Sequence, residues 1–290
     1  MHALSVAEIV ESWDGLKWYI ERDYDRVVLS KGELSVLKAI YTLASAPGFE
    51  VFVDVGAHVG YHAVRAARKF RKVVALEPNP HNREVLARNV ALNLLDNVTI
   101  LPYAAGESRY TGTMWLAGTG STLLPGIVRG ETVEVEVAPL DELVDRADVI
   151  KIDTEGYEWR VLQGATRLID AQKPALVIEH HDFRPQYAAT VNDYPKIKKF
   201  LRERGYIEIC LATQHRLWYP LDRPLEPVRS LIVHHWIQHC INNLRHGRDW
   251  YYAVPYTWWW GMDLIDFIYE LPEHVLRPDE PEWVERLLRD

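Results

Sequence analysis

Cysteine is scarce in this chain: among 290 residues there are two, Cys210 and Cys240. Two cysteines do not make a disulfide framework, so the composition is typical of a protein of a reducing cytoplasm. No apolar run reaches the roughly 18–20 residues that a membrane-spanning helix needs. The acidic N-terminal segment also lacks the apolar core of a signal peptide. We therefore expect a cytoplasmic protein without a transmembrane segment.

Positively charged residues are fewer than negatively charged ones. The chain carries 33 Lys and Arg against 41 Asp and Glu, which gives a formal net charge of -8. Proteins that hold nucleic acids electrostatically need a surplus of cationic side chains. The composition therefore disfavours a nucleic-acid partner.

Between Phe49 and Glu179, short apolar runs alternate with amphipathic, helix-like segments. The apolar runs are residues 51–55, 72–76, 97–101, 148–152 and 175–179. Repeats of strand and helix at this length predict a parallel sheet with helices on both faces.

Other segments depart from this alternation. Alternating polar and apolar residues predict an inserted hairpin at 111–116 and 132–137. The loop between them, 117–130, contains Ser121 and Thr122, which either contact a substrate or form a turn. A helix at 194–204 and an antiparallel pair at 207–211 and 216–219 are expected to follow.

The chain divides by pattern into three parts. Residues 1–48 are expected to form an extension with a helix, a short strand pair and a helix at 31–46, residues 49–220 the main domain, and residues 221–290 a C-terminal extension. The last part has two predicted helices, at 233–244 and 281–288, and the aromatic run WYYAVPYTWWW at 250–260. That run suits packing onto the domain or a homo-oligomer interface more than an acceptor-stacking surface.

The first apolar run ends in the segment VFVDVGAHVG, residues 51–60. Gly56 and Gly60 let the backbone turn tightly beside a ligand, and the next helix directs its amino end to the same place. A dinucleotide-binding loop has the pattern G-x-G-x-x-G, whereas this loop lacks the central glycine. Asp54 would repel a phosphate and suits a ligand that carries an amino group. The loop therefore favours a nucleotide-like ligand other than a dinucleotide.

A second acid follows the next apolar run. Glu77 lies 21 residues after Gly56, close to the spacing of about 20 residues for a ribose-binding acid. A carboxylate only accepts hydrogen bonds, so it can receive both hydroxyl groups of an adenosine ribose. Pro78 and Asn79 come next, and Asn79 before Pro80 is a typical helix start. We expect residues 77–79 to lie at the cofactor.

Four segments together resemble the FkbM-type methyltransferases, a branch of the class I S-adenosylmethionine-dependent fold. They are VFVDVGAHVGYHA, VVALEPNPHNREVLARNVALN, LPYAAGES and, most specifically, VIKIDTEGYEWRVLQGA. The resemblance covers about residues 51–219. One departure is His58, where the family usually has Asn, and we expect this difference to alter a cofactor contact.

The resemblance implies a Rossmann-like α/β fold with a seven-stranded, mostly parallel sheet and an antiparallel last strand. It implies S-adenosyl-L-methionine as cofactor, with a sugar, glycan or small-molecule hydroxyl group as methyl acceptor. Carried over by position, the cofactor-binding residues are Asp54, Gly56 and Gly60 for the methionine part, Glu77 for the ribose, and Tyr103, Ala104 and Ala105 for the adenine. His58 and Asp153 complete the expected cofactor-binding set.

The ends of the fourth and fifth apolar runs carry the candidates for chemistry, because open parallel sheets bind ligands there. Asp153 and Glu155 follow the fourth run, and Glu179 and His180 end the fifth. Transfer to a hydroxyl group needs a base, and His180 is a candidate because the pKa of histidine lies near neutrality. Asp153 is the other catalytic candidate, while Glu155 is equally suited to shaping the turn.

A metal alternative stays open at the same place. Asp153, Glu179 and His180 offer ligands of the kind that hard and intermediate metals take. Their spacing is not decisive for any metal, so we do not assign one.

Three functions compete at this stage. The first is a methyltransferase acting on the hydroxyl group of a glycan or small molecule. The second is a methyltransferase acting on nitrogen in protein or RNA, although the chain has DTEG where the usual [DN]-P-P-[YF] motif would stand. The third is a non-catalytic cofactor-binding scaffold on the same fold.

Overall fold

The computed structural model describes residues 7–21, 33–181, 191–212 and 214–232. The chain forms two compact units, Met1–Arg223 and Pro224–Asp290. Of the second unit, the described residues are 224–232, which include the short 3-10 helix η3 (Glu226–Val228). The predicted helices at 233–244 and 281–288 and the aromatic run lie outside the described residues.

A seven-stranded sheet is the centre of the first unit. In spatial order its strands are β11 (Tyr206–Cys210), β12 (His215–Pro220), β10 (Ala175–Glu179), β9 (Val149–Ile152), β3 (Val51–Val55), β4 (Lys72–Leu76) and β5 (Val98–Leu101). The five strands from β10 to β5 run parallel, whereas β12 lies antiparallel between β10 and β11. This order and the inserted antiparallel last strand are those of the class I methyltransferase fold, so the predicted fold is confirmed.

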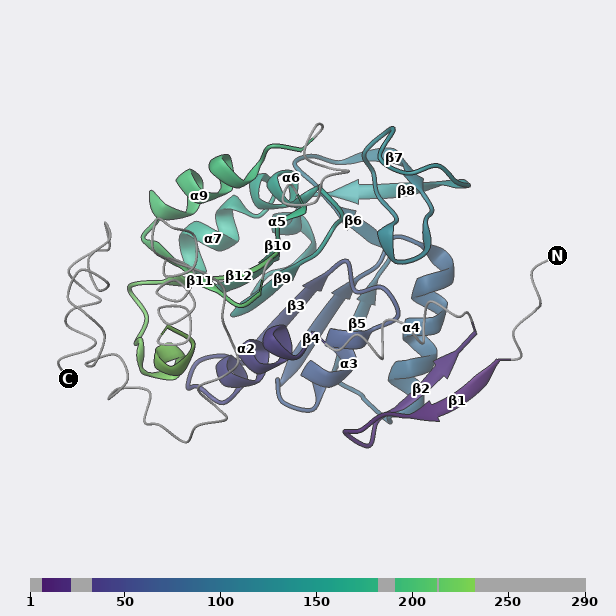
Figure 1. Cartoon of the computed structure of the whole chain (residues 1–290), viewed down its shortest axis with the longest axis horizontal. Helices are drawn as coiled ribbons and strands as arrows, with labels where there is room; N and C mark the ends of the chain where they lie inside the picture. Colours follow the sequence, from purple (N-terminus) through teal and green to yellow (C-terminus); the bar gives the residue numbers. More distant parts are fainter. Residues whose placement is uncertain (1–6, 22–32, 182–190, 213, 233–290) are drawn as a thin grey trace, which may run out of the picture. The chain divides into compact units, whose positions relative to one another are not determined.

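Helices cover both faces of the sheet (Figure 1). On one face lie α2 (Leu34–Ala44), α3 (Tyr61–Ala67) and α4 (Pro80–Leu92). On the other lie α5 (Leu140–Leu143), α6 (Glu158–Gln163), α7 (Thr166–Gln172) and α9 (Tyr194–Arg202). Because both faces are covered, the central strands are apolar without alternation, and β3, β9 and β10 are buried along their whole length.

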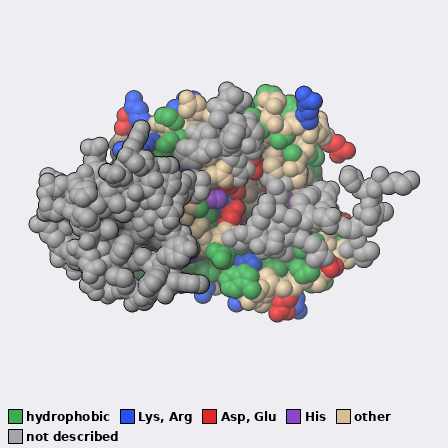
Figure 2. Space-filling view, viewed as in Figure 1, with side chains coloured by type: hydrophobic (Ala, Val, Ile, Leu, Met, Phe, Trp, Pro, Cys, Tyr) green, Lys and Arg blue, Asp and Glu red, His purple; other side chains and the backbone are tan. Residues whose placement is uncertain are grey.

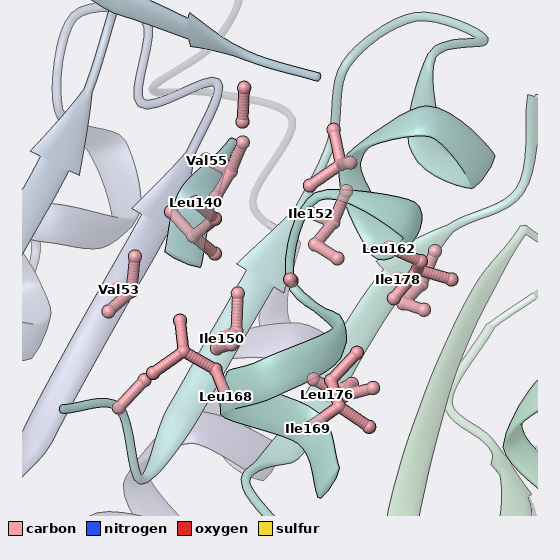
Figure 3. Close-up of a cluster of buried hydrophobic side chains, with 14 of the residues drawn as sticks. Val53, Val55, Leu140, Ile150, Ile152, Leu162, Leu168, Ile169, Leu176 and Ile178 are labelled. Atoms are coloured by element: carbon pink, nitrogen blue, oxygen red, sulfur yellow. The ribbon is translucent and has the colours of Figure 1, made fainter. Parts of the chain in front are cut away.

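A hydrophobic cluster of buried residues joins the second face to its helices (Figure 3). Alternate strand residues such as Val53, Ile150 and Leu176 pack there against Leu140 and Leu168. Fully burying such an aliphatic side chain contributes about 1.5–3 kcal/mol. The cluster therefore fixes the strands whose carboxyl ends carry the site.

The predicted start of α4 is confirmed. Asn79 is the N-cap, its side-chain oxygen accepts a hydrogen bond from the backbone NH of His81 at 3.0 Å, and Pro80 is the first helical residue. This local signal places Asn79 and the preceding Glu77 at the end of β4.

The inserted hairpin is present and has a third strand. β7 (Tyr110–Trp115) pairs antiparallel with β8 (Thr132–Ala138), and β6 (Tyr103–Ala105) adds parallel to β8. A 3-10 turn, η1 (Gly118–Gly120), lies in the connecting loop. The insertion carries Ser121 and Thr122 toward the edge of the main sheet.

The N-terminal residues form the strand pair β1 (Glu8–Glu11) and β2 (Lys17–Ile20), and residues 7–21 contain no helix. Arg65 of α3 is buried between the rings of Trp18 and Tyr61 and donates to Asp14 at 2.8 Å. The hairpin is thereby attached to α3. Among the helices that the structure describes, none has the length and apolarity needed to cross a bilayer.

Candidate active site

A cavity of about 280 Å³ opens at the carboxyl ends of the central strands. Figure 2 shows acidic and histidine side chains gathered in a hollow in the middle of this face. The predicted site residues in its wall are Gly56, His58, Glu77, Pro78, Tyr103, Ala104, Ala105, Asp153, Glu155 and Glu179. Four others, Asp54, Gly60, Asn79 and His180, are not in the wall.

Gly56 is where β3 passes closest to the end of β9. Its φ of +82° lies in the left-handed region, and an added Cβ would stand 2.0 Å from the carbonyl oxygen of Asp153. Both the conformation and the close approach require glycine. The residue therefore brings the first loop and Asp153 to one place.

His58 adopts a left-handed backbone with φ 51°. Asn and His are among the few residues other than glycine that are enriched in this region. Replacement of the family's usual Asn by His58 therefore keeps the turn that the loop needs. The backbone NH of His58 donates to Glu77 Oε2 at 2.8 Å.

Glu77 is a buried carboxylate with acceptor capacity to spare. Its Oε1 accepts from the backbone NH of Asn79 at 2.9 Å and has a longer contact of 3.5 Å from Asn82 Nδ2. A carboxylate has about four acceptor positions, so with His58 three are occupied, one of them weakly. Burial raises the pKa of Glu77 to about 7, against these hydrogen bonds.

Three further predicted residues support the wall from behind. Asp54 is fully buried, and its Oδ1 lies 3.8 Å from Lys151 Nζ. Burial raises the pKa of Asp54, and Lys151 opposes this shift. Gly60 is the N-cap of α3 with φ 95°, and Asn79 caps α4. Each of the three thus has a structural role beside the cavity, and their contact with a cofactor stays a prediction.

The loop after β9 is held in a strained shape. Glu155 has a left-handed φ of 52°, which costs a residue other than glycine about 1–3 kcal/mol. Thr122 donates to its carbonyl oxygen at 2.7 Å. Glu158 accepts from the backbone NH groups of Thr154 at 3.2 Å and Gly156 at 3.0 Å. These contacts turn the side chain of Glu155 into the wall.

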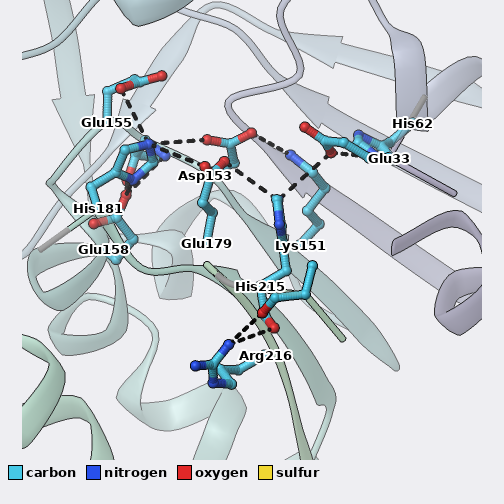
Figure 4. Close-up of polar contacts among 12 residues, drawn as sticks. Glu33, His62, Lys151, Asp153, Glu155, Glu158, Glu179, His181, His215 and Arg216 are labelled. Carbon is cyan, nitrogen blue, oxygen red and sulfur yellow. Dashed lines mark hydrogen bonds and ion pairs between the residues drawn. The ribbon is translucent and has the colours of Figure 1, made fainter. Parts of the chain in front are cut away.

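His181, rather than His180, contacts the carboxylates beside the cavity (Figure 4). Its Nδ1 is 2.9 Å from Glu158 Oε1 and its Nε2 is 3.1 Å from Glu155 Oε2. Burial disfavours its charge, but Glu158 and Glu155 outweigh burial and raise the pKa of His181 to about 11. A histidine held as a cation cannot take a proton.

His180, the base predicted from the sequence, is not in the cavity wall, whereas Glu179, the last residue of β10, is. His180 is buried against Tyr194 and Trp218, whose indole NH lies 3.4 Å from His180 Nε2. Burial lowers the pKa of His180 to about 3.

The candidate metal ligands in the structure also differ from those predicted from the sequence, because His181 stands in place of His180. Oxygens of Asp153 and Glu179 and a nitrogen of His181 lie within 4.8 Å of one another, and Glu33, Glu179 and His215 form a second such group. His181 is already engaged with carboxylates as a cation, which competes with metal binding. His180 takes no part in either group.

Comparison with known proteins gives a consistent result. The profile described as "Methyltransferase FkbM domain" matches residues 54–208. The chain belongs to the FkbM methyltransferase family. Among curated relatives, the hexuronic acid methyltransferase AglP of Haloferax volcanii is 27% identical over 54% of this chain. The methyltransferase sdnD of Sordaria araneosa is 29% identical over 53%. The chain spans 66% of the first relative's length and 76% of the second's.

Among solved structures, the FkbM methyltransferase of Methylobacillus flagellatus KT is similar at 22% identity and a TM-score of 0.44. The similarity covers 62% of this chain and 48% of that one.

Several residues of the cavity wall were not predicted from the sequence. Lys151 interrupts an otherwise apolar strand, and a buried lysine needs a carboxylate partner, so the pattern VIKID was a usable signal. Glu33 precedes α2, lies 3.2 Å from His62 Nε2 and reaches the wall from the N-terminal part. No local pattern marks Glu33, because its place depends on how α2 packs.

Proposed function

We propose that this FkbM-family protein transfers the methyl group of S-adenosyl-L-methionine to a hydroxyl oxygen of a sugar, glycan or small metabolite. The observation that carries the proposal is Glu77. It is a buried carboxylate in the cavity wall, fixed by two backbone NH groups, and it keeps an acceptor position for a ribose hydroxyl group.

The wall offers what each part of this cofactor needs. Pro78, Ala104 and Ala105 supply apolar surface beside Tyr103, which suits an adenine ring. The turn at Gly56 exposes backbone beside Asp153, which suits the methionine part. When bound, the cofactor supplies an electrophilic methyl group on a positively charged sulfur, and a wall rich in carboxylates is compatible with that charge.

The acceptor end of the cavity lies where β9 and β10 finish. Asp153, Glu155 and Glu179 meet there, and the inserted sheet contributes Ser121, Thr122 and Leu123 to the wall. This mixture of carboxylates, hydroxyl groups and an apolar side chain can orient a hydroxylated acceptor. The hexuronic acid methyltransferase among the relatives supports a sugar as the acceptor.

Binding is the first test. Isothermal titration with S-adenosylmethionine should give saturable binding that Glu77→Ala weakens at least tenfold. Glu84→Ala is the matched control, because Glu84 lies exposed on α4 in an ion pair with Arg88. If the wild-type protein does not bind, or both variants bind like it, the cofactor assignment fails.

Transfer is the second test. The protein would be incubated with methyl-tritiated S-adenosylmethionine and either neutral glycosides, hexuronic acid glycosides, RNA or a protein mixture. Label in a glycoside supports the proposal. Label only in RNA or protein supports the nitrogen-methylating alternative, and binding without transfer to any acceptor supports a scaffold. The cytoplasmic location and the C-terminal aromatic interface stay predictions from the sequence.

A further inference from the structure

Two carboxyl groups of the wall face each other across the ends of β9 and β10. Asp153 and Glu179 each offer an oxygen within 4.8 Å of the other and of His181. Glu179 is 4% exposed and still lines the cavity. Two carboxylates this close cannot both ionise freely, so one of them is expected to hold a proton more strongly.

The charged neighbours of Asp153 and Glu179 decide which of the two carboxyl groups holds a proton more strongly (Figure 4). Asp153 Oδ2 lies 3.0 Å from Lys151 Nζ, a buried cation. Glu179 lies 3.7 Å from His181 Nε2 and 3.5 Å from His215 Nε2.

The two carboxyl groups therefore differ in pKa. Burial opposes the charge of Asp153, but Lys151 and His181 hold its pKa well below its usual range. Burial and the charge of Asp153 both raise the pKa of Glu179, against His215. The carboxylate with the higher pKa is the better proton acceptor near neutral pH.

We propose that Glu179 is the general base of the transfer and that Asp153 is a fixed anion beside it. The inference rests on the proposed function, since it assigns the proton acceptor for the hydroxyl group of that reaction. His180 is off the cavity and His181 is a bound cation, so neither histidine takes this role. Glu155 Oε2 is already paired with His181 Nε2 at 3.1 Å.

The O–H bond of the acceptor breaks and its proton passes to a carboxylate oxygen of Glu179. The acceptor oxygen forms a bond to the methyl carbon while the sulfur–carbon bond breaks, and its electron pair stays on sulfur. The products are a methyl ether, S-adenosylhomocysteine and protonated Glu179, which later returns the proton to water.

Among the described residues, other charged groups surround Glu179. They are Asp153 just after β9, with Lys151 of β9 at 3.0 Å from it, His181 just after β10, His215 of β12, and Glu33 before α2, which lies 3.8 Å from His215 Nε2. Protonation of His215 would favour ionised Glu179, while Glu33 and Asp153 act against it.

An infrared titration tests the pair without any acceptor. In heavy water, the carbonyl band of a protonated carboxyl group should disappear with a midpoint above the ordinary range of glutamate. Glu179→Gln should remove that band, and Asp153→Asn should move its midpoint to lower pH because the neighbouring charge is gone. Glu77 keeps its own band in both variants, whereas the Asp54 band also moves in Asp153→Asn, because Asp153 raises the pKa of Asp54. An unchanged spectrum in Glu179→Gln, or an unmoved midpoint in Asp153→Asn, overturns the unequal pair.

Kinetics test the catalytic role with an acceptor found in the transfer assay. Glu179→Gln keeps the shape of the side chain and should lower kcat by about 10²–10⁴-fold, with an unchanged Kd for S-adenosylmethionine. Glu179→Asp should keep part of the rate and its pH dependence. Glu208→Gln is the control, because Glu208 lies on the same sheet in a salt bridge with Arg216, away from the cavity wall.

The outcomes separate the two proposals. If the wild-type protein transfers methyl groups and Glu179→Gln does so at the same rate, Glu179 is not the base and the proposed function stands. If the wild-type protein neither binds the cofactor nor transfers, the proposed function fails, and the infrared titration still decides whether the carboxyl pair exists.

Discussion

The hydroxyl group of Thr122 donates a 2.7 Å hydrogen bond to the carbonyl oxygen of Glu155. This bond joins the loop of the inserted sheet to the loop after β9, where Glu155 has a left-handed backbone. Thr122 is almost fully buried, so no water replaces the bond if it is lost. The inserted sheet thus stabilises the strained turn that presents Glu155 to the cavity.

Thr122→Val should therefore destabilise the protein by about 1–3 kcal/mol, since it leaves a buried carbonyl group without its donor at nearly constant volume. Urea denaturation would measure the change. Thr111→Val is the control, because its hydroxyl group bonds Glu136 on an exposed surface, and it should cost less than about 0.5 kcal/mol. Equal losses in the two variants would contradict a special role for Thr122.

Gly56→Ala should be strongly destabilising. The left-handed φ alone costs about 1–2 kcal/mol, and the clash with the Asp153 carbonyl adds about 1–3 kcal/mol. Gly48→Ala separates the two effects, because Gly48 has φ +83° with open space at the Cβ position. Thermal unfolding should show a clearly larger loss for Gly56→Ala, and similar losses would show that the close approach to Asp153 is relaxed in solution.

Cofactor affinity should depend on pH through Glu77, whose pKa burial raises to about 7. Ribose hydroxyl groups donate to the ionised form, so binding below pH 7 must first remove a proton. Each pH unit below the pKa then lowers affinity by up to about tenfold, and we expect weaker binding at pH 6 than at pH 8. Calorimetry over this range should show the trend in the wild type and a flat profile in Glu77→Gln; a trend that survives in the variant must come from another group.

The free energy of unfolding should also depend on pH through His181, a histidine that is charged in the folded protein. Its folded pKa, about 11, lies above the unfolded value of about 6.5. The stabilisation by the charged form is therefore complete below about pH 6.5 and is lost as pH rises through the folded pKa. His181→Gln breaks a buried pair and should cost about 3–5 kcal/mol at pH 6.

The difference between wild type and His181→Gln should shrink as the pH of the urea titrations rises from 6 to 10. His81→Gln is the control, because His81 is more exposed and lies 3.6 Å from Glu21. A constant difference across this range would mean that His181 is held uncharged.

Most of the fold could be predicted from the sequence, because the local sequence signals agree with the pattern of burial. Apolar runs marked the five parallel strands, and Asn79 before Pro80 marked the start of α4. The third strand of the inserted sheet, β6, was missed, since three residues give no periodicity. The positions of the loop glycines and of Glu77 could be predicted, because these positions depend on the backbone of their own segments.

The site was harder to foresee where it depends on side-chain direction or on distant segments. His180 and His181 are adjacent, and only the fold decides that His181 is the one that contacts Glu155 and Glu158. Glu33 and His215 come from opposite ends of the first unit and meet at 3.8 Å. Lys151, which was given no role from the sequence, keeps Asp153 ionised.

The position of β12 has a consequence for the order in which the protein becomes active. This strand is the last of the sheet in the chain, yet it lies inside the sheet and carries His215 to Glu179. During synthesis, the earlier strands emerge and can collapse first, but β10 keeps an unpaired edge until residues 206–220 have left the ribosome. A nascent chain can therefore have its cofactor loop before the charges around its proposed base are in place.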